Sequence, residues 1–221
     1  MVTAHPTSEY RLLLASQSPR RRELLALLGL PFEIAAPDID EAPLAGESPP
    51  ELAARLSQAK AQACFNSHSI VIACDTIVAH EGQVMGKPRD TDEASEMLHR
   101  LRGQPHSVYT AITLLEEASS TLTDVAETRV VMRAYTDDEL VAYVASGDPM
   151  DKAGAYAIQH RRFAPVSEVQ GCYANVMGLP LCHLARCLRH WKIRPLRDVP
   201  NACQSHINHR CAVYPSILNS K

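Results

Sequence analysis

Hydrophobic and polar positions follow two periods along this chain, and the change from one to the other predicts alternating strands and helices. Short apolar runs at residues 12–15 and 70–74 are typical of strands that are buried on both faces. Between them, leucines recur at helical spacing from Leu24 to Leu28, just before a glycine that can end a helix. A serine cap followed by Pro19, which suits the first helical position, marks where this helix begins.

Later elements are marked by capping residues and by β-branched or aromatic runs. Four signals predict the starts of helices: Ser48 with Glu51, Asp90 with Glu93, Thr136 with Glu139, and Pro180, which opens a final helix through Trp191. Strands are expected at residues 32–36, 106–115 and 121–135, and the proline-rich acidic segment 37–50 is expected to be a loop. This order predicts an α/β fold, as one sizeable domain or two small lobes.

Composition places the chain among globular proteins. It has 221 residues, of which 46% are hydrophobic and 21% charged, and its net charge of −3 does not favour non-specific attraction to nucleic acid. The sequence contains neither an apolar run long enough to span a membrane nor a secretory signal, so a cytoplasmic location is expected. Five of the seven cysteines lie in apolar or helical segments and are expected to be reduced core residues, namely Cys64, Cys74, Cys172, Cys182 and Cys187.

Three consecutive arginines follow Pro19 at the junction of the first strand and the first helix. Cations there oppose the positive end of the helix dipole, unless an anion binds them together with the free backbone N–H groups. Phosphate is the leading candidate, because α/β proteins place ligands at such junctions; a solvated basic turn is the alternative. Arg20 and Arg22 are separated by about 200° around the helix, so they cannot both face one ligand.

Several charged residues lie where a packed core does not require them. They are Asp40 and Glu41, Asp75 at the expected end of a buried strand, Lys87, and Asp151 with Lys152. A buried carboxylate such as Asp75 needs a cation, a metal or hydrogen-bond donors, although a helix-capping or turn role is the alternative. Carboxylates beside cations suit phosphoryl transfer to water. Residues 82–88 lack the spacing of a P-loop, and Ser16, without a paired base, is expected to donate a hydrogen bond to phosphate.

Six motifs in a fixed order resemble those of the Maf-like nucleoside triphosphate pyrophosphatases. The motifs are Leu14-Ala15-Ser16-Gln17-Ser18-Pro19-Arg20-Arg21, Arg55-Leu56 with Lys60-Ala61, Cys74-Asp75-Thr76-Ile77-Val78, Gly86-Lys87-Pro88-Arg89, Asp151-Lys152-Ala153-Gly154-Ala155-Tyr156-Ala157-Ile158-Gln159, and Gly178-Leu179-Pro180-Leu181. The similarity runs from about residue 11 to 191. It departs from the family pattern at Cys74, where the family more often has a small residue such as alanine.

This resemblance implies a two-lobed mixed-sheet α/β domain with flanking helices and a central cleft, similar to inosine triphosphatases. It also implies metal-dependent hydrolysis of a nucleoside triphosphate to the monophosphate and pyrophosphate, in a protein that is commonly a homodimer. Asp75 matches the catalytic proton acceptor, and Arg20, Thr76 and Gln159 match specificity positions of the dTTP/UTP-cleaving branch. The further implied site residues are Ser16, Arg21, Lys60 and Lys87 for substrate, and Glu41 with Asp75 for a divalent cation such as Mg²⁺ or Mn²⁺.

The regions outside this similarity are residues 1–10, expected to be an N-terminal extension, and the tail 196–221, with the domain spanning 11–195. The tail contains Cys203, His206, His209 and Cys211, which are zinc-type ligands at an unusual spacing; a polar, poorly ordered terminus is favoured over a metal site. Other functions that stay open are a pyrophosphatase for modified nucleotides such as 7-methyl-GTP, and a non-enzymatic nucleotide- or nucleic-acid-binding regulator of cell division.

Overall fold

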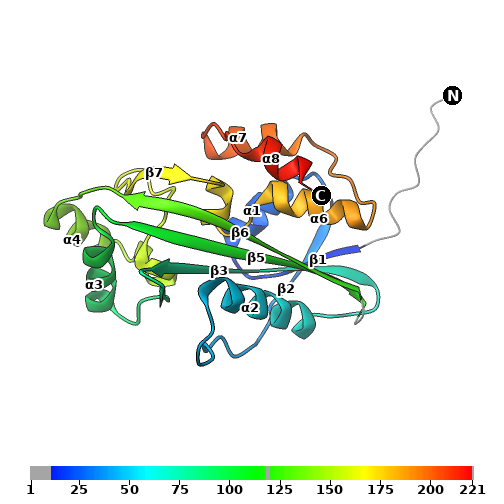
Figure 1. Cartoon of the computed structure of the whole chain (residues 1–221), viewed down its shortest axis with the longest axis horizontal. Coiled ribbons are helices and arrows are strands. Elements are labelled where there is room, and N and C mark those ends of the chain that lie inside the picture. Colours follow the sequence, from blue (N-terminus) through cyan, green and yellow to red (C-terminus); the bar gives the residue numbers. More distant parts are fainter. Residues whose placement is uncertain (1–10, 118–119, 221) are drawn as a thin grey trace.

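A seven-stranded mixed sheet forms the centre of the computed structural model, which describes residues 11–117 and 120–220 (Figure 1). The strand order is β2-β1-β3-β5-β6-β7, and β4 pairs with β3. Strands β1, β2 and β3 are parallel, and all other pairs are antiparallel. The strands are β1 (Arg11–Ala15), β2 (Phe32–Ala35), β3 (Ser69–His80), β4 (Gln83–Met85), β5 (Pro105–Glu117), β6 (Ser120–Met132) and β7 (Val166–Gln170). The predicted mixed α/β fold is confirmed, and the predicted extension 1–10 lies outside the described residues.

Helices cover both faces of this sheet. α2 (Pro49–Ala63) lies on one face, and α1 (Pro19–Ala26), α5 (Tyr173–Val176) and α6 (Leu181–His190) lie on the other (Figure 1). α3 (Thr91–Leu101), α4 (Asp137–Ala145) and two 3₁₀ turns, η1 (Asp148–Asp151) and η2 (Ala153–Ala155), lie at one end of the long strands. None of the helices in the described ranges is long and apolar enough to span a bilayer.

The capping signals in the sequence correctly predict where the helices begin. The Ser18 side chain accepts a hydrogen bond from the Arg21 N–H at the start of α1, and Asp90 accepts one from Glu93 at the start of α3. Ser48 with Glu51 and Thr136 with Glu139 form the predicted capping boxes of α2 and α4. These local contacts fix the entry of each helix, and in α1 they fix the orientation of the basic turn.

Strand β3 is longer than the sequence predicts, and this changes the position of Asp75. The prediction ends the strand near Asp75, whereas β3 continues to His80 and places Asp75 in its middle. The strand continues because Asp75 to Ala79 pair with Ala111 to Ser107 of β5. The polar residues Asp75 and Thr76 suggest a strand end in the sequence, but pairing with β5 continues through both of them.

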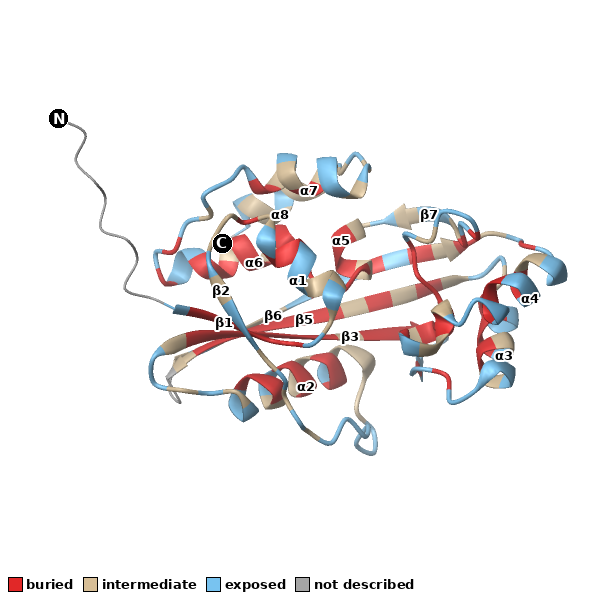
Figure 2. Cartoon of the chain, turned by 180° about the vertical axis from the view of Figure 1, so that it is seen from behind, coloured by how far each residue is buried: buried red, intermediate tan, exposed pale blue. Residues whose placement is uncertain are grey.

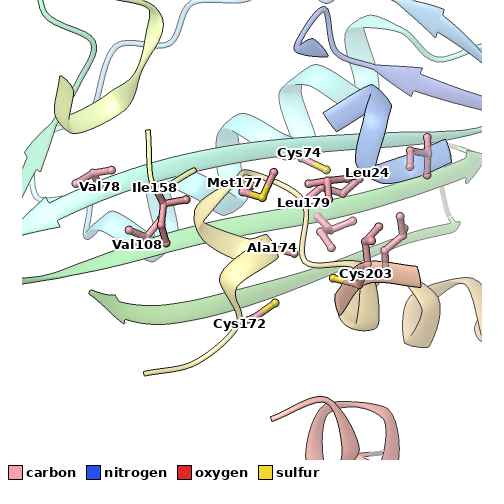
Figure 3. Close-up of a cluster of buried hydrophobic side chains, with 14 of the residues drawn as sticks. Leu24, Cys74, Val78, Val108, Ile158, Cys172, Ala174, Met177, Leu179 and Cys203 are labelled. Carbon is pink, nitrogen blue, oxygen red and sulfur yellow. The ribbon is translucent and has the colours of Figure 1, made fainter. Parts of the chain in front are cut away.

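Alternate residues of the buried strands pack on opposite faces of the sheet. Leu12, Ile70 and Ile72 face α1 and α6, while Leu13 and Val71 face α2, and all are buried. Figure 2 shows that β1 and β3 are buried along most of their length. The larger cluster joins Leu24 of α1 to residues from the far end of the chain, including Cys172, Leu179 and Cys203, which Figure 3 shows together. One core therefore fixes α1 against the sheet and against the C-terminal helices.

The C-terminal tail is folded, so the prediction of a poorly ordered terminus is wrong. It forms α7 (Val199–Ile207) and α8 (Tyr214–Asn219), and therefore α6 is not the final helix. Val199 and Cys203 are buried in the main core, so packing against the rest of the molecule holds α7 in place. Arg186 and Arg189 of α6 donate hydrogen bonds to the backbone oxygens of Ile217 and Leu218, at 3.1 Å each.

All seven cysteines lie within the described residues and are unpaired. Cys74, Cys172, Cys182 and Cys187 are buried as predicted, whereas Cys64 is only partly buried. Burial raises the pKa of the Cys74 thiol to about 11, so this side chain acts as a small apolar group in β3.

Packing of α1 against the core is expected to depend on Leu24, which is fully buried. Leu24→Ala should lower the free energy of unfolding by about 2–5 kcal/mol, because a cavity replaces the buried isobutyl group. Urea denaturation gives this value. Arg22→Ala, two residues away and exposed, is the control and should change stability by less than about 0.5 kcal/mol. Equal losses in the two variants would show that α1 is not held by its leucine face.

Candidate active site

One edge of β3 has a gap in its strand pairing. On that edge β1 pairs with β3 up to Ala73, and β4 pairs from Val78 onward. Within the described residues no strand pairs with that edge between these two points. Because side chains alternate along a strand, Asp75 lies on the α2 face and Thr76 lies on the α1 face at this gap. A ligand at the open edge can therefore reach polar groups from both faces of the sheet.

On the α2 face, two carboxylates share one ammonium group. Lys60 of α2 lies with its Nζ 2.5 Å from Asp75 Oδ1 and 2.5 Å from Glu41 Oε1. The Asp75 and Lys60 side chains are 8% and 10% exposed, whereas Glu41 is 51% exposed. A buried carboxylate requires such a partner, so Lys60 accounts for the burial of Asp75. The three predicted residues Glu41, Lys60 and Asp75 thus lie together.

The electrostatic environment of Glu41 connects it to further predicted residues. Partial burial acts to raise the pKa of Glu41, but the hydrogen bond from Lys60 and the charges of Lys60, Lys87 and Arg21 outweigh burial, so the pKa lies below its usual value. Lys87 itself is exposed, in the loop after β4. Its charge and that of Arg21 therefore act on the same region as the carboxylates.

On the α1 face, Arg21 is held by three hydrogen bonds. Its guanidinium donates from Nε to the Gly178 oxygen at 2.9 Å, from Nη2 to Thr76 Oγ1 at 3.0 Å, and from Nη1 to Ser16 Oγ at 3.4 Å. Gly178 has φ +103°, and a Cβ there would lie 3.3 Å from Thr76 Oγ1 and 3.4 Å from Arg21 Nε. Glycine thus permits both the backbone conformation and the close approach of Arg21.

The direction of the hydrogen bonds through Thr76 follows from its neighbours. Thr110 donates its hydroxyl proton to the Asn175 oxygen, at 2.9 Å. The 3.0 Å contact between the Thr76 and Thr110 hydroxyls is then donated by Thr76, because each hydroxyl has one proton. The Thr76 hydroxyl accepts a hydrogen bond from Arg21 and donates one to the buried Thr110 hydroxyl. Its hydroxyl therefore positions Arg21.

Two predicted residues, Arg20 and Gln159, line a pocket of about 840 Å³ next to this cluster. Arg20 Nη1 lies 3.5 Å from Asp151 Oδ2, and Lys152 Nζ donates to Asp151 at 2.6 Å. Asp75, Lys60 and Glu41 do not line the pocket. The predicted residues therefore form two adjacent groups, a charged cluster at the β3 edge and a pocket on the α1 face.

Several residues of the site have no clear signal in the sequence. Thr110 and Asn175 are buried polar residues that support Thr76, and Tyr173 and Met177 line the pocket. A buried threonine in a strand resembles any β-branched residue, and α5 is a helix of four residues. Gly178 does have a signal, because it begins the motif Gly178-Leu179-Pro180-Leu181. A glycine in such a motif can indicate a close contact, here with Arg21.

Candidate metal ligands at the charged cluster are the two carboxylates. Their oxygens lie within about 5 Å of each other, since each is 2.5 Å from Lys60 Nζ. Mg²⁺ is commonly held by one or two carboxylates with substrate phosphates and water, so the pair fits such an ion.

The zinc-type residues of the tail do not form one site. His206 and His209 line the large pocket, while Cys203 and Cys211 line a separate small cavity. Across the described ranges, no three His, Cys, Asp or Glu side chains are arranged to hold a metal ion.

Comparison with known proteins identifies the family of this chain. Residues 11–191 match the family described as "Maf-like protein". The chain belongs to this family. It is 45% identical to the dTTP/UTP pyrophosphatase of Geotalea uraniireducens over 80% of this chain and 93% of that protein. It is 48% identical to the dTTP/UTP pyrophosphatase of Anaeromyxobacter dehalogenans over 81% of this chain and 93% of that protein.

Solved structures with partial similarity were also found. One is a HAM1 protein from Coxiella burnetii, with a TM-score of 0.41 and 19% identity over 57% of this chain and 74% of that one. Another is a nucleoside-triphosphatase, also named dITP/XTP pyrophosphatase, from Mycobacterium abscessus, with a TM-score of 0.37 and 16% identity over 56% and 73% of the two chains.

The lowered pKa of Glu41 predicts a pH-dependent contribution to stability. A carboxyl with a lowered pKa in the folded state stabilises the fold above its unfolded pKa, and this contribution is lost as the pH falls through the folded pKa. At pH 7, Glu41→Gln should therefore be less stable than wild type, by a few tenths to about 1 kcal/mol because Glu41 is half exposed. The difference should decrease progressively as the pH is lowered from 7 to 3. Thermal melting at both pH values measures it, with Glu96→Gln, exposed on α3, as the control; a constant difference at both pH values would contradict the ion pair.

Proposed function

We propose that this protein is a nucleoside triphosphate pyrophosphatase that hydrolyses dTTP and UTP to the monophosphate and pyrophosphate. The observation that carries the proposal is the joint placement of Asp75, Lys60 and Arg21 at the open edge of β3, beside a pocket lined by Arg20 and Gln159. The relatives that are 44–48% identical over most of the chain are named dTTP/UTP pyrophosphatases, which supports the choice of substrate.

In the proposed reaction, a water oxygen attacks the α-phosphorus as Asp75 accepts a proton from that water. The bond between the α-phosphorus and the bridging oxygen breaks, and pyrophosphate leaves with the electron pair. Arg21 can donate bidentate hydrogen bonds to phosphate oxygens, and Ser16 lies beside it. Lys60 holds Asp75 in position, since its ammonium lies against the carboxylate.

A divalent cation completes the proposal. Glu41 and Asp75 would hold Mg²⁺ or Mn²⁺, which would neutralise charge on the phosphate oxygens. Lys87 is proposed to contact the phosphates from the loop after β4.

Base recognition is proposed to depend on the pocket. Gln159 is exposed there and offers both a donor and an acceptor, as the imide edge of thymine or uracil requires. Thr76, whose hydroxyl is bonded within the protein, contributes by orienting Arg21. Turnover of dTTP and UTP would make the protein a nucleotide-pool enzyme, and we expect it to act as a homodimer.

A substrate panel tests the proposed function. The wild-type protein with Mg²⁺ or Mn²⁺ should release pyrophosphate from dTTP and UTP well ahead of CTP, dATP, dGTP and 7-methyl-GTP. Cytosine differs from uracil by exchanging an acceptor and a donor on one edge, which leaves site groups unpaired at about 1–3 kcal/mol each. Ion chromatography distinguishes pyrophosphate from orthophosphate. Equal turnover of CTP and UTP, or release of orthophosphate, would contradict the proposal.

A second test concerns Asp75. Asp75→Asn should lower kcat by at least about a hundredfold, because the amide cannot accept the proton from water. The variant should remain folded and bind UTP, because Lys60 keeps Glu41 as its partner and Arg21 is untouched. Pyrophosphate release, circular dichroism and calorimetric titration measure the three properties. Asp138→Asn, exposed on α4, is the control, and activity of Asp75→Asn within a few-fold of wild type would exclude the assigned role.

A further inference from the structure

The pocket beside Arg21 has a wall that the family match does not contain. Its lining comes from α1, residues 158–161, β7 and the α5 segment, all inside the matched range 11–191, and from residues 206–209 at the end of α7. The chain segment that follows the matched region therefore forms one side of the pocket that contains Arg20 and Gln159.

The tail is held firmly where it meets the pocket. Asn208 ends α7 with φ +50°, and the His209 N–H donates to the Gln204 oxygen at 3.3 Å. The Gln204 side chain in turn accepts from the Cys211 N–H at 2.9 Å. Because Cys203 is buried in the main core, this turn is attached to the same packed cluster as α1. Residues 206–209 thus face the pocket from a fixed backbone.

The chemistry of this wall suits a planar, polar ring. His209 lies against Tyr173, with ring centroids 5.0 Å apart and a tilt of 31°, so two rings form one edge of the pocket. Asn208 adds an amide with both donors and an acceptor to a lining that also contains the amide of Gln159. The rest of the lining combines apolar side chains such as Met177 with charged ones such as Arg161 and Glu168. A base can stack on such rings while amides meet its polar edge.

The pocket is also connected to the charged cluster through two short links. Arg20 in the pocket precedes Arg21, and Met177 in the pocket precedes Gly178, whose oxygen accepts from Arg21. One ligand with an anionic end at Arg21 and a ring in the pocket can therefore span both groups. A nucleoside triphosphate has this shape.

We infer that the tail completes the nucleoside-binding part of the active site, with His209 and Asn208 contacting the base and sugar of the pyrimidine nucleotide. This inference rests on the proposed function. It assigns to residues 206–209 a part in substrate affinity and base choice, and none in the chemistry at the α-phosphorus.

The test compares a nucleotide with its phosphate part alone. In the full-length protein, His209→Ala should raise KM for UTP about fivefold to tenfold with little change in kcat, because a stacking surface is lost. His209→Phe, which keeps a ring, should retain most of the affinity. The dissociation constant of inorganic tripolyphosphate, measured by calorimetry, should be the same in wild type and both variants. Asn201→Ala, exposed on α7 outside the pocket, is the control.

The outcomes separate this inference from the proposed function. If wild type cleaves UTP and His209→Ala has an unchanged KM, the tail wall does not contact the nucleoside, and the inference is overturned while the function stands. If His209→Ala weakens the binding of tripolyphosphate as much as that of UTP, the tail acts on the phosphate site. This result also overturns the inference. If wild type neither cleaves nor binds UTP or dTTP, the proposed function itself fails. Melting temperatures of all variants show whether each remains folded.

Discussion

The gap in pairing along one edge of β3 is the constraint on which the site depends. A strand paired on both edges would bury Asp75 and Thr76 between neighbours and leave no access for a ligand. Here the pairing of β3 with β1 ends at Ala73 and its pairing with β4 begins at Val78, so the backbone stays regular through pairing with β5 while the other edge is open. Because side chains alternate, one short segment supplies a carboxylate to one face and a hydroxyl to the other.

The two faces of the gap are stabilised by different means. On the α2 face, charge pairing makes burial of Asp75 possible, and removal of Lys60 would leave a buried carboxylate without its cation. On the α1 face, a chain of hydrogen bonds to neutral acceptors holds the guanidinium of Arg21. It runs from Arg21 to the Thr76 hydroxyl, then to the Thr110 hydroxyl and the Asn175 oxygen. The first arrangement sets where negative charge lies. The second fixes the orientation of the Arg21 guanidinium.

The sequence allowed prediction of features that depend on short-range patterns. Capping residues gave the helix starts, ordered motifs gave Arg21, Lys60 and Asp75, and the charged loop residues gave Glu41. These four residues do lie together. Two predictions failed for long-range reasons. The length of β3 is set by its partner β5, and the folded tail is set by packing of Val199 and Cys203 into the core. Neither interaction is visible in a local window, and the roles of the site residues remain predictions.

The charge around the gap bears on the proposed need for a metal ion. Glu41 and Asp75 carry two negative charges, and Lys60, Lys87 and Arg21 carry three positive ones, all acting on the same region. The cluster therefore has a surplus of one positive charge, whereas a nucleoside triphosphate brings about four negative charges. Lys60 also forms ion pairs with the two carboxylates. We propose that Arg21 and Lys87 are the cations of this cluster that face the phosphates of the substrate. We propose that a divalent cation supplies the missing positive charge, because carboxylates at a phosphate site are otherwise repulsive. On this view Glu41 and Asp75 would hold the ion, and Lys60 offsets part of their negative charge by lying against both carboxylates.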